Sequence, residues 1–197
     1  TRSTLLDSES SLDTEPVNDI LSRLRLDFMI SATPGMQLRV YTNTITDDYI
    51  DIYGSGPINA VYDEKEGFSM KGSLSLTRGT YKFTMQDIFP KEFAIQPGST
   101  LGFNGDPFLA NLNLKTIYTV PSAPLTDLSI TAERRKNVKV NCLMDITGTL
   151  QSPNLTFGLE LPDGNEEERE LLASATSTPE QTNMQFIYLI GIGKFYT

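Results

Sequence analysis

The sequence predicts an all-β fold, because apolar and polar residues alternate along most of the chain and short runs rich in Gly, Pro, Asn and Asp separate the alternating segments. Successive side chains of a strand point to opposite faces of a sheet, so this alternation gives each strand one hydrophobic and one polar face. About ten such strands follow one another at regular spacing. The spacing is typical of a repeat-like stack of strands, although no strict sequence period is present.

Residues 1–16 are polar and acidic and end at Pro16, which predicts a flexible lead-in. The β domain is expected to span residues 17–162. The chain starts with neither an initiator Met nor a signal peptide, so we expect it to be a piece of a longer protein. It contains no run of the roughly 18 apolar residues that a membrane-spanning helix requires.

Four strands are predicted before residue 63 from apolar residues at every second position. These apolar residues lie within the ranges 24–32, 36–40, 50–52 and 58–62. Pro34-Gly35 and Thr46-Asp47-Asp48 predict turns between them, and Gly54-Ser55-Gly56-Pro57 is expected to end the third strand.

The segment from Phe68 to Met85 has the clearest alternation and forms the centre of the predicted sheet. Its apolar face carries Phe68, Met70, Leu74, Leu76, Tyr81, Phe83 and Met85. The alternation is interrupted at Arg78-Gly79 and then resumes. A glycine at such a position predicts a bulge or kink in the strand.

The remaining predicted strands lie between Phe93 and Leu161. Their apolar residues are Phe93 and Ile95, Leu101 and Phe103, Ala110 to Leu114, Leu128 and Ile130, Val138 to Ile146, and Leu155 to Leu161. Cys142 is the one cysteine, so no intramolecular disulfide can form, and its place in an alternating strand is typical of a small core residue.

Residues 163–197 change to a helical pattern. The first helix is predicted to start with the acidic run Glu166-Glu167-Glu168, which complements the positive end of a helix dipole. The second is predicted to have Thr178 as its N-cap and Pro179 in its first turn. This second helix is too apolar to be exposed, so it either caps the apolar face of the sheet or continues into a further part of the protein.

Composition excludes several classes of function. The chain has no histidine, which rules out Ser-His-Asp and Cys-His nucleophile arrangements. A net charge of −9 argues against a nucleic-acid partner, and the basic cluster Arg134-Arg135-Lys136 is interpreted as a solvated turn. We therefore expect no catalytic residue, and no cofactor or metal.

Acidic residues could suggest other sites, but each has a simpler interpretation. Asp47, Asp48 and Asp51 lack the Gly and terminal Glu of an EF-hand loop, and a solvated turn is favoured. Glu166-Glu167-Glu168 is explained as a helix start. No pair of carboxylates stands out as in a glycoside hydrolase.

Four motifs, taken in this order and spacing, resemble the C-terminal domain of the TamB family, the translocation and assembly module of bacterial envelopes, in a Bacteroidetes-like form. They are G-S-L-S-L-x-x-G-x-Y-x-F at Gly72–Phe83, P-G-S-x-L-x-F-N-G-D-P-x-x-A-N-L-N-L at Pro97–Leu114, G-x-L-x-S-P-x-L-x-F-x-L-x-L-P at Gly148–Pro162, and L-x-x-x-G-x-F at Leu189–Phe195. The resemblance covers roughly Leu24 to the C-terminus.

The resemblance implies a long β-sheet curled lengthwise into a solenoid-like half-tube, a β-taco with a hydrophobic concave face, followed by one or two short helices. It also implies the periplasmic part of an inner-membrane-anchored protein of a Gram-negative bacterium, which moves phospholipid between membranes and supports outer-membrane protein assembly. The parent protein would meet an outer-membrane partner of the BamA or TamA type. The matching positions are Gly, Pro and generic apolar residues, so no active site is implied. Neither the family's N-terminal anchor nor its partner-docking C-terminal strand is recognised here.

The alternation itself predicts a large apolar face, which either closes on itself as a sandwich or barrel core or remains open as a groove. Methionines among the Phe and Leu residues give a soft lining suited to acyl chains. With the resemblance added, we expect a hydrophobic groove that binds phospholipid acyl chains. The residues expected to line it are Phe68, Met70, Leu74, Leu76, Tyr81, Phe83, Leu112, Leu114, Val140, Met144, Leu155 and Phe157.

Two other functions remain open at this point. A chaperone-like scaffold would bind client β-strands along a sheet edge by augmentation. A closed β-sandwich adhesin or carbohydrate-binding domain would use aromatic residues on the polar face, for which Tyr41, Tyr49 and Tyr53 are the candidates.

Overall fold

The computed structural model describes residues 25–85, 89–128 and 136–197. Several expectations lie outside these residues: the flexible lead-in at 1–16, the apolar residues Leu24 and Ile130, and Arg134-Arg135 of the basic cluster. Within the described residues, no helix combines the length and the hydropathy needed to cross a membrane.

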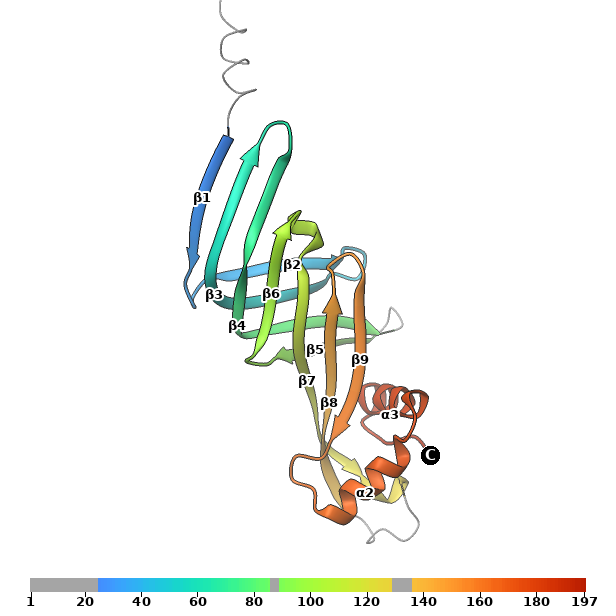
Figure 1. Ribbon diagram of the computed structural model, residues 1–197. Coiled ribbons are helices and arrows are strands. Elements are labelled where there is room, and N and C mark those ends of the chain that lie inside the picture. Colours follow the sequence, from blue (N-terminus) through green and yellow to red (C-terminus); the bar gives the residue numbers. More distant parts are fainter. Residues whose placement is uncertain (1–24, 86–88, 129–135) are drawn as a thin grey trace, which may run out of the picture.

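One antiparallel sheet of nine strands contains all the described strands (Figure 1). The strands are β1 (Arg25–Ala32), β2 (Gln37–Asn43), β3 (Asp48–Asp63), β4 (Gly67–Met85), β5 (Phe89–Ile95), β6 (Ser99–Gly105), β7 (Asn111–Pro124), β8 (Asn137–Gly148) and β9 (Pro153–Glu160). Their order is β1-β3-β4-β5-β7-β8-β9, with β2 paired to β3 and β6 paired to both β4 and β7. This confirms the predicted all-β fold with short C-terminal helices.

Two long strands, β3 and β4, bend together in the middle of the sheet. The first half of β3 pairs with β2 and its second half with β1, so the two halves run in different directions (Figure 1). The expectation that Gly54-Ser55-Gly56-Pro57 ends a strand is wrong, because β3 passes through these residues. The glycines bend the strand without breaking its pairing with β4.

Glycines make this bend possible because the two backbones approach closely there. Gly56 has φ +152°, and a Cβ atom on it would lie 2.2 Å from the carbonyl oxygen of Ser73. Gly72 on β4 has φ +133°, and its Cβ would lie 2.4 Å from the carbonyl oxygen of Pro57. A residue with a side chain would force the strands apart at both positions.

A bulge in β4 explains why the apolar parity changes along this strand. Tyr53 pairs with Arg78 and Gly54 pairs with Leu76, so Thr77 has no partner in register. Because of this extra residue, the apolar face carries even-numbered positions up to Leu76 and odd-numbered positions from Tyr81 onward. The bulge therefore lies two residues before Gly79, where the sequence predicted a bulge or kink.

The segment after β7 also differs from expectation. A strand was predicted at Leu128 and Ile130, but Leu125–Asp127 forms a single turn of 3₁₀ helix, and the N–H of Leu128 donates to the carbonyl of Leu125. Another 3₁₀ turn, Pro107–Leu109, connects β6 to β7 and has Asp106 as its N-cap. Pro124 and Pro107 stand at the starts of these turns because proline supplies no N–H and has φ near −65°.

Two helices follow the sheet, α2 (Glu166–Ala175) and α3 (Pro179–Ile192). The predicted cap of the second is confirmed: the Thr178 hydroxyl accepts from the N–H of Gln181, and the Gln181 side chain accepts from the N–H of Thr178. Gly193 ends α3 in the left-handed conformation, with φ +70°.

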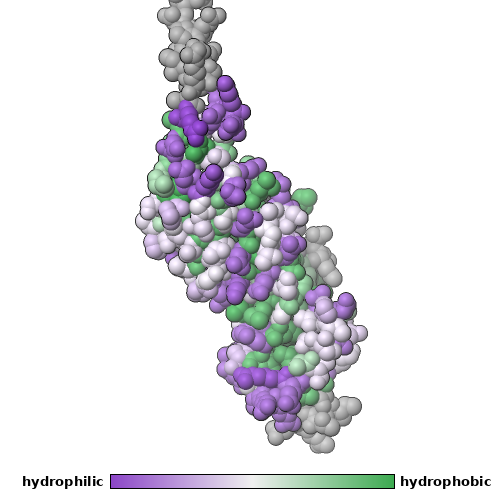
Figure 2. All heavy atoms as spheres, viewed as in Figure 1, coloured by the Kyte–Doolittle hydropathy of each residue, from purple (hydrophilic) through white to green (hydrophobic). Residues whose placement is uncertain are grey.

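The core lies on one face of the curled sheet and continues under α3. Its largest fully buried side chains include Phe93, Leu114, Met144, Phe186 and Leu189. Figure 2 shows hydrophobic residues gathered along the middle of the molecule, between hydrophilic flanks.

Candidate functional site

The apolar face of the sheet is the candidate site, and strand register shows that its side chains form continuous rows. Residues directly opposite each other in paired strands share a face of the sheet. One row runs Leu74–Leu101–Leu112 across β4, β6 and β7. A second runs Leu114–Ile146–Leu155 across β7, β8 and β9.

The structure brings eleven of the twelve sequence-predicted groove residues into one hydrophobic cluster. Seven of them are buried, with exposed fractions of 0–7%: Leu74, Leu76, Tyr81, Leu112, Leu114, Val140 and Met144. Four are partly buried against the same cluster: Met70, Phe83, Leu155 and Phe157. Phe68 lies outside it and is 48% exposed. The centre of the apolar face is thus filled by the protein's own side chains.

The apolar face becomes exposed where β1, β3 and β4 extend beyond the rest of the sheet. We call this region the open end and define it as Leu26, Phe28, Ile30, Tyr62 and Phe68. Their exposed fractions are 38%, 43%, 43%, 39% and 48%. Register connects them to the core, because Leu26, Tyr62 and Phe68 form one row and Ile30 pairs with the buried Ile58.

At the opposite end, α3 covers the apolar face of β7, β8 and β9. The Phe186 ring stacks on Phe157 at a centroid distance of 4.2 Å and on Phe93 at 6.1 Å. Leu189, Ile190 and Phe186 are 1–3% exposed. Of the two expectations for this apolar helix, the structure shows the first, in which the helix packs on the sheet.

Sequence reasoning omitted several residues of this face from the groove list. Leu26, Phe28, Ile30 and Tyr62 of the open end, and Phe93 at the centre, were predicted to be apolar strand residues but not assigned to the groove. Their alternation was visible in the sequence. The alternation did not reveal the strand order, which places β1 beside β3 and so extends the apolar face.

Polar groups on the buried face are satisfied within the sheet. The Thr116 hydroxyl, in a residue that is 1% exposed, donates to the carbonyl of Met144 at 2.8 Å. Ser99 is fully buried, and its hydroxyl donates to the carbonyl of Gln96 and accepts from the N–H of Lys115. These hydroxyls therefore offer no unpaired group for catalysis or ligand binding.

Cys142 lies in the core of β8 and is fully buried. Burial raises the pKa of its thiol to about 12 because the thiolate would lose its hydration. The residue is therefore a structural thiol, as the sequence predicted, and not a reactive one.

The polar face carries a cross-strand network around the three candidate tyrosines. The guanidinium of Arg39 lies 4.2 Å from the ring centroid of Tyr49, and that of Arg78 lies 4.1 Å from the ring centroid of Tyr53. Hydrogen bonds raise the pKa of Arg39, and the bond with Tyr41 has a larger effect than the bond with Asp51. Cations thus already occupy ring faces of two of the three tyrosines on which a carbohydrate would stack.

The aspartates near β3 have structural partners. Asp48 is 6% exposed, and its carboxylate accepts from the backbone N–H and the hydroxyl of Thr84. The solvated-turn interpretation is therefore wrong for Asp48, which starts β3 and pins it to the end of β4. Asp51 accepts from the side chains of Gln37 and Arg39. Within the described part of the chain, no cluster of three potential metal-ligating residues occurs.

Comparison of the sequence with known protein families identifies a family that fits this architecture. The family model of the TamB C-terminal domain matches residues 3–196, essentially the whole chain. A search of curated proteins gave no match. The extent of the family match and the curled antiparallel sheet with its apolar face together show that this chain belongs to the TamB family and carries its C-terminal domain.

Proposed function

We propose that the apolar face binds phospholipid acyl chains and forms part of a route for phospholipid between the inner and outer membranes. The chain would be the periplasmic part of an inner-membrane-anchored, TamB-like protein that has no enzymatic activity. Through its parent protein it would meet an outer-membrane partner of the BamA or TamA type and support outer-membrane protein assembly. Membership of this bacterial envelope family supports the location and role.

The single observation that carries the proposal is the open end, an apolar surface continuous with the buried core. Exposed side chains of this size on adjacent strands cost free energy in water, and soluble monomers seldom expose such a patch without a binding role. An acyl chain covering it would gain about 0.8 kcal/mol for each buried CH₂ group. Tails would lie along the apolar face and head groups would remain in water.

Passage beyond the open end requires movement of the core. Leu74 and Leu76 are each 3% exposed, so a tail can advance only where such side chains move aside. Open ends of a sheet separate more readily than its centre because fewer contacts hold them. The route is therefore a face that opens around its cargo and not a permanent channel.

The experiment compares two glutamate substitutions on opposite faces of β1. Phe28→Glu places a charge in the open end, and Met29→Glu, at a residue that is 70% exposed, places the same charge on the other face of the same strand. Native mass spectrometry after incubation with phospholipid liposomes, with organic extraction of bound material, measures uptake. We expect uptake by the wild type and Met29→Glu and its loss in Phe28→Glu. Equal uptake by all three, or an apo mass for the wild type, would overturn the proposal.

Substitutions at the centre of the face make a poorer test. If the centre of the face were open, a charge at Leu76 or Leu114 would block transport without unfolding the sheet. Both residues are at most 3% exposed, however, so Leu76→Glu or Leu114→Asp would bury an unpaired carboxylate. Such a charge destabilises the fold itself, and loss of binding would then be uninformative.

A second candidate function is supported by the sheet edges. Among the described strands, β1 pairs only with β3 and β9 pairs only with β8. Such edges can accept a further strand, as a chaperone-like scaffold for client β-strands would require. Binding of an extended outer-membrane-protein peptide, together with no uptake of lipid, would favour this function over the first.

A further inference from the structure

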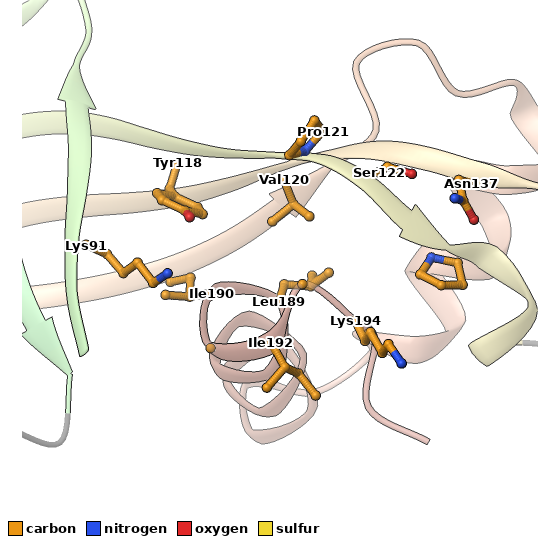
Figure 3. A pocket seen from close by; sticks show the side chains of 13 residues that line it. Lys91, Tyr118, Val120, Pro121, Ser122, Asn137, Leu189, Ile190, Ile192 and Lys194 are labelled. Atoms are coloured by element: carbon orange, nitrogen blue, oxygen red, sulfur yellow. The ribbon is translucent and has the colours of Figure 1, made fainter. Parts of the chain in front are cut away.

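A pocket of about 490 Å³ lies between the C-terminal end of α3 and the last part of β7. Tyr118 and Val120 form its wall on β7, and Leu189, Ile190 and Ile192 form its wall on α3 (Figure 3). Tyr118 and Val120 follow Leu114 at even spacing on β7, so they belong to the apolar face of the sheet. The pocket therefore lies on that face, beside α3.

Two lysines flank this pocket from opposite sides, Lys91 from β5 and Lys194 just after α3 (Figure 3). Lys91 is the more unusual of the two, because it is a charged residue on the apolar face. It pairs with Phe83, while the neighbouring Phe93 pairs with Tyr81, so Lys91 occupies an inward position on the apolar face. Its ammonium nitrogen lies 5.6 Å from the ring centroid of Tyr118, and the residue is half-buried.

The local charge of the pocket is opposite to that of the chain. The sequence has 25 acidic and 16 basic residues, yet the part of the lining that the structure describes includes two lysines and no carboxylate. Glu92, next to Lys91, points to the other face, where it lies opposite Lys82. A cation after a helix C-terminus complements the helix dipole, which accounts for Lys194. That explanation does not apply to Lys91, which lies on a strand.

We propose that this pocket binds the anionic head group, a phosphate or carboxylate, of an amphiphile whose acyl chain lies against the half-buried Tyr118 and the exposed Ile192. Lys91 makes the main contact, and Lys194, which is exposed and free to reorient, completes it. Hydrogen bonds between an ammonium and an anionic oxygen are among the stronger ones in proteins. The inference rests on the proposed function in taking the ligand to be a lipid, and adds a preference for anionic over net-neutral head groups.

The test uses the full chain and two single-chain lipids that differ only in head group, lysophosphatidylglycerol and lysophosphatidylcholine, below their micelle concentrations. We expect the wild type to bind the anionic lipid about tenfold more tightly, which corresponds to about 1.4 kcal/mol. Lys91→Gln should lose most of this preference, and Lys91→Gln with Lys194→Gln all of it. Lys71→Gln, an exposed position on the opposite face of β4, is the matched control and should keep it. An unchanged preference in the double variant, or none in the wild type, would overturn the inference.

Two further measurements separate the sources of failure. Inorganic phosphate alone is expected to bind at least a hundredfold more weakly than the anionic lysolipid, because it gains nothing from the apolar walls; comparable affinity would overturn the amphiphile assignment. Liposome uptake by the lysine double variant tests the open end separately. A head-group preference that depends on the lysines, found together with no effect of Phe28→Glu on uptake, would refute the proposed function and leave the pocket intact. The reverse pattern would refute only the pocket.

Discussion

Replacing Phe186 with alanine tests how α3 is held on the sheet. Phe186 is 2% exposed, and its ring stacks on Phe157 at 4.2 Å with an interplanar angle of 22°, and on Phe93 at 6.1 Å with an angle of 16°. Truncating a buried phenylalanine to alanine costs about 3–5 kcal/mol. Each aromatic pair contributes about 0.5–1.5 kcal/mol beyond its buried area.

This loss of stability should affect the docking of α3 more than the stability of the sheet. A 14-residue helix is marginal by itself, so α3 depends on its docking. The strands below it retain their ladder of hydrogen bonds when the helix leaves. We therefore expect Phe186→Ala to detach α3 locally and to expose Phe93 and Phe157.

Hydrogen exchange followed by mass spectrometry distinguishes local from global opening. In the variant, peptides from 179–192 should exchange at least a hundredfold faster, while peptides from β7 and β8 remain protected. Ile187→Ala is the matched control, because Ile187 is adjacent, of similar size and 37% exposed. It should change the free energy of unfolding by less than about 1 kcal/mol. Unchanged exchange of α3 in Phe186→Ala would refute docking through the stacked rings.

Three further predictions concern the bend, the buried thiol and the attachment of α2. Gly56→Ala should lower the free energy of unfolding by at least about 3 kcal/mol in urea titrations, because its Cβ would lie 2.2 Å from the carbonyl oxygen of Ser73; a loss below about 1 kcal/mol would contradict the close approach. Burial raises the pKa of Cys142 from 9.0 to about 12 in the folded state. The contribution of the neutral thiol to the free energy of unfolding is therefore intact below pH 9. It falls by about 1.4 kcal/mol for each pH unit between pH 9 and pH 12. The free energies of unfolding measured at pH 8 and pH 10.5 should therefore differ less in Cys142→Ala than in the wild type. Equal differences in the two proteins would contradict the burial argument. Glu168→Gln should cost about 1 kcal/mol at low salt and less at high salt, since the 2.6 Å contact of Glu168 with the half-exposed Lys136 loses its charge; no salt dependence in the difference between the two proteins would refute this.

The candidate site was predictable in part. Alternation identified the apolar residues of β4, β7, β8 and β9, because a period of two fixes which side chains share a face within one strand. It did not identify Phe28 and Phe68 as the exposed members of that face, or Leu76 and Leu114 as buried ones. Alternation reports that a face is apolar, and says nothing about what covers it.

Local patterns were enough to predict most strands from alternation, several turns from Gly and Pro, and the start of α3 from Thr178 and Pro179. They did not predict the continuity of β3 through Gly54–Gly56, the position of β6 between β4 and β7, or the packing of Phe186 on Phe157. The difference comes from the range of the interactions involved. Caps and turns are set by hydrogen bonds and torsions within a few residues. Strand neighbours and the covering of an apolar face are set by burial between segments that lie far apart in the chain.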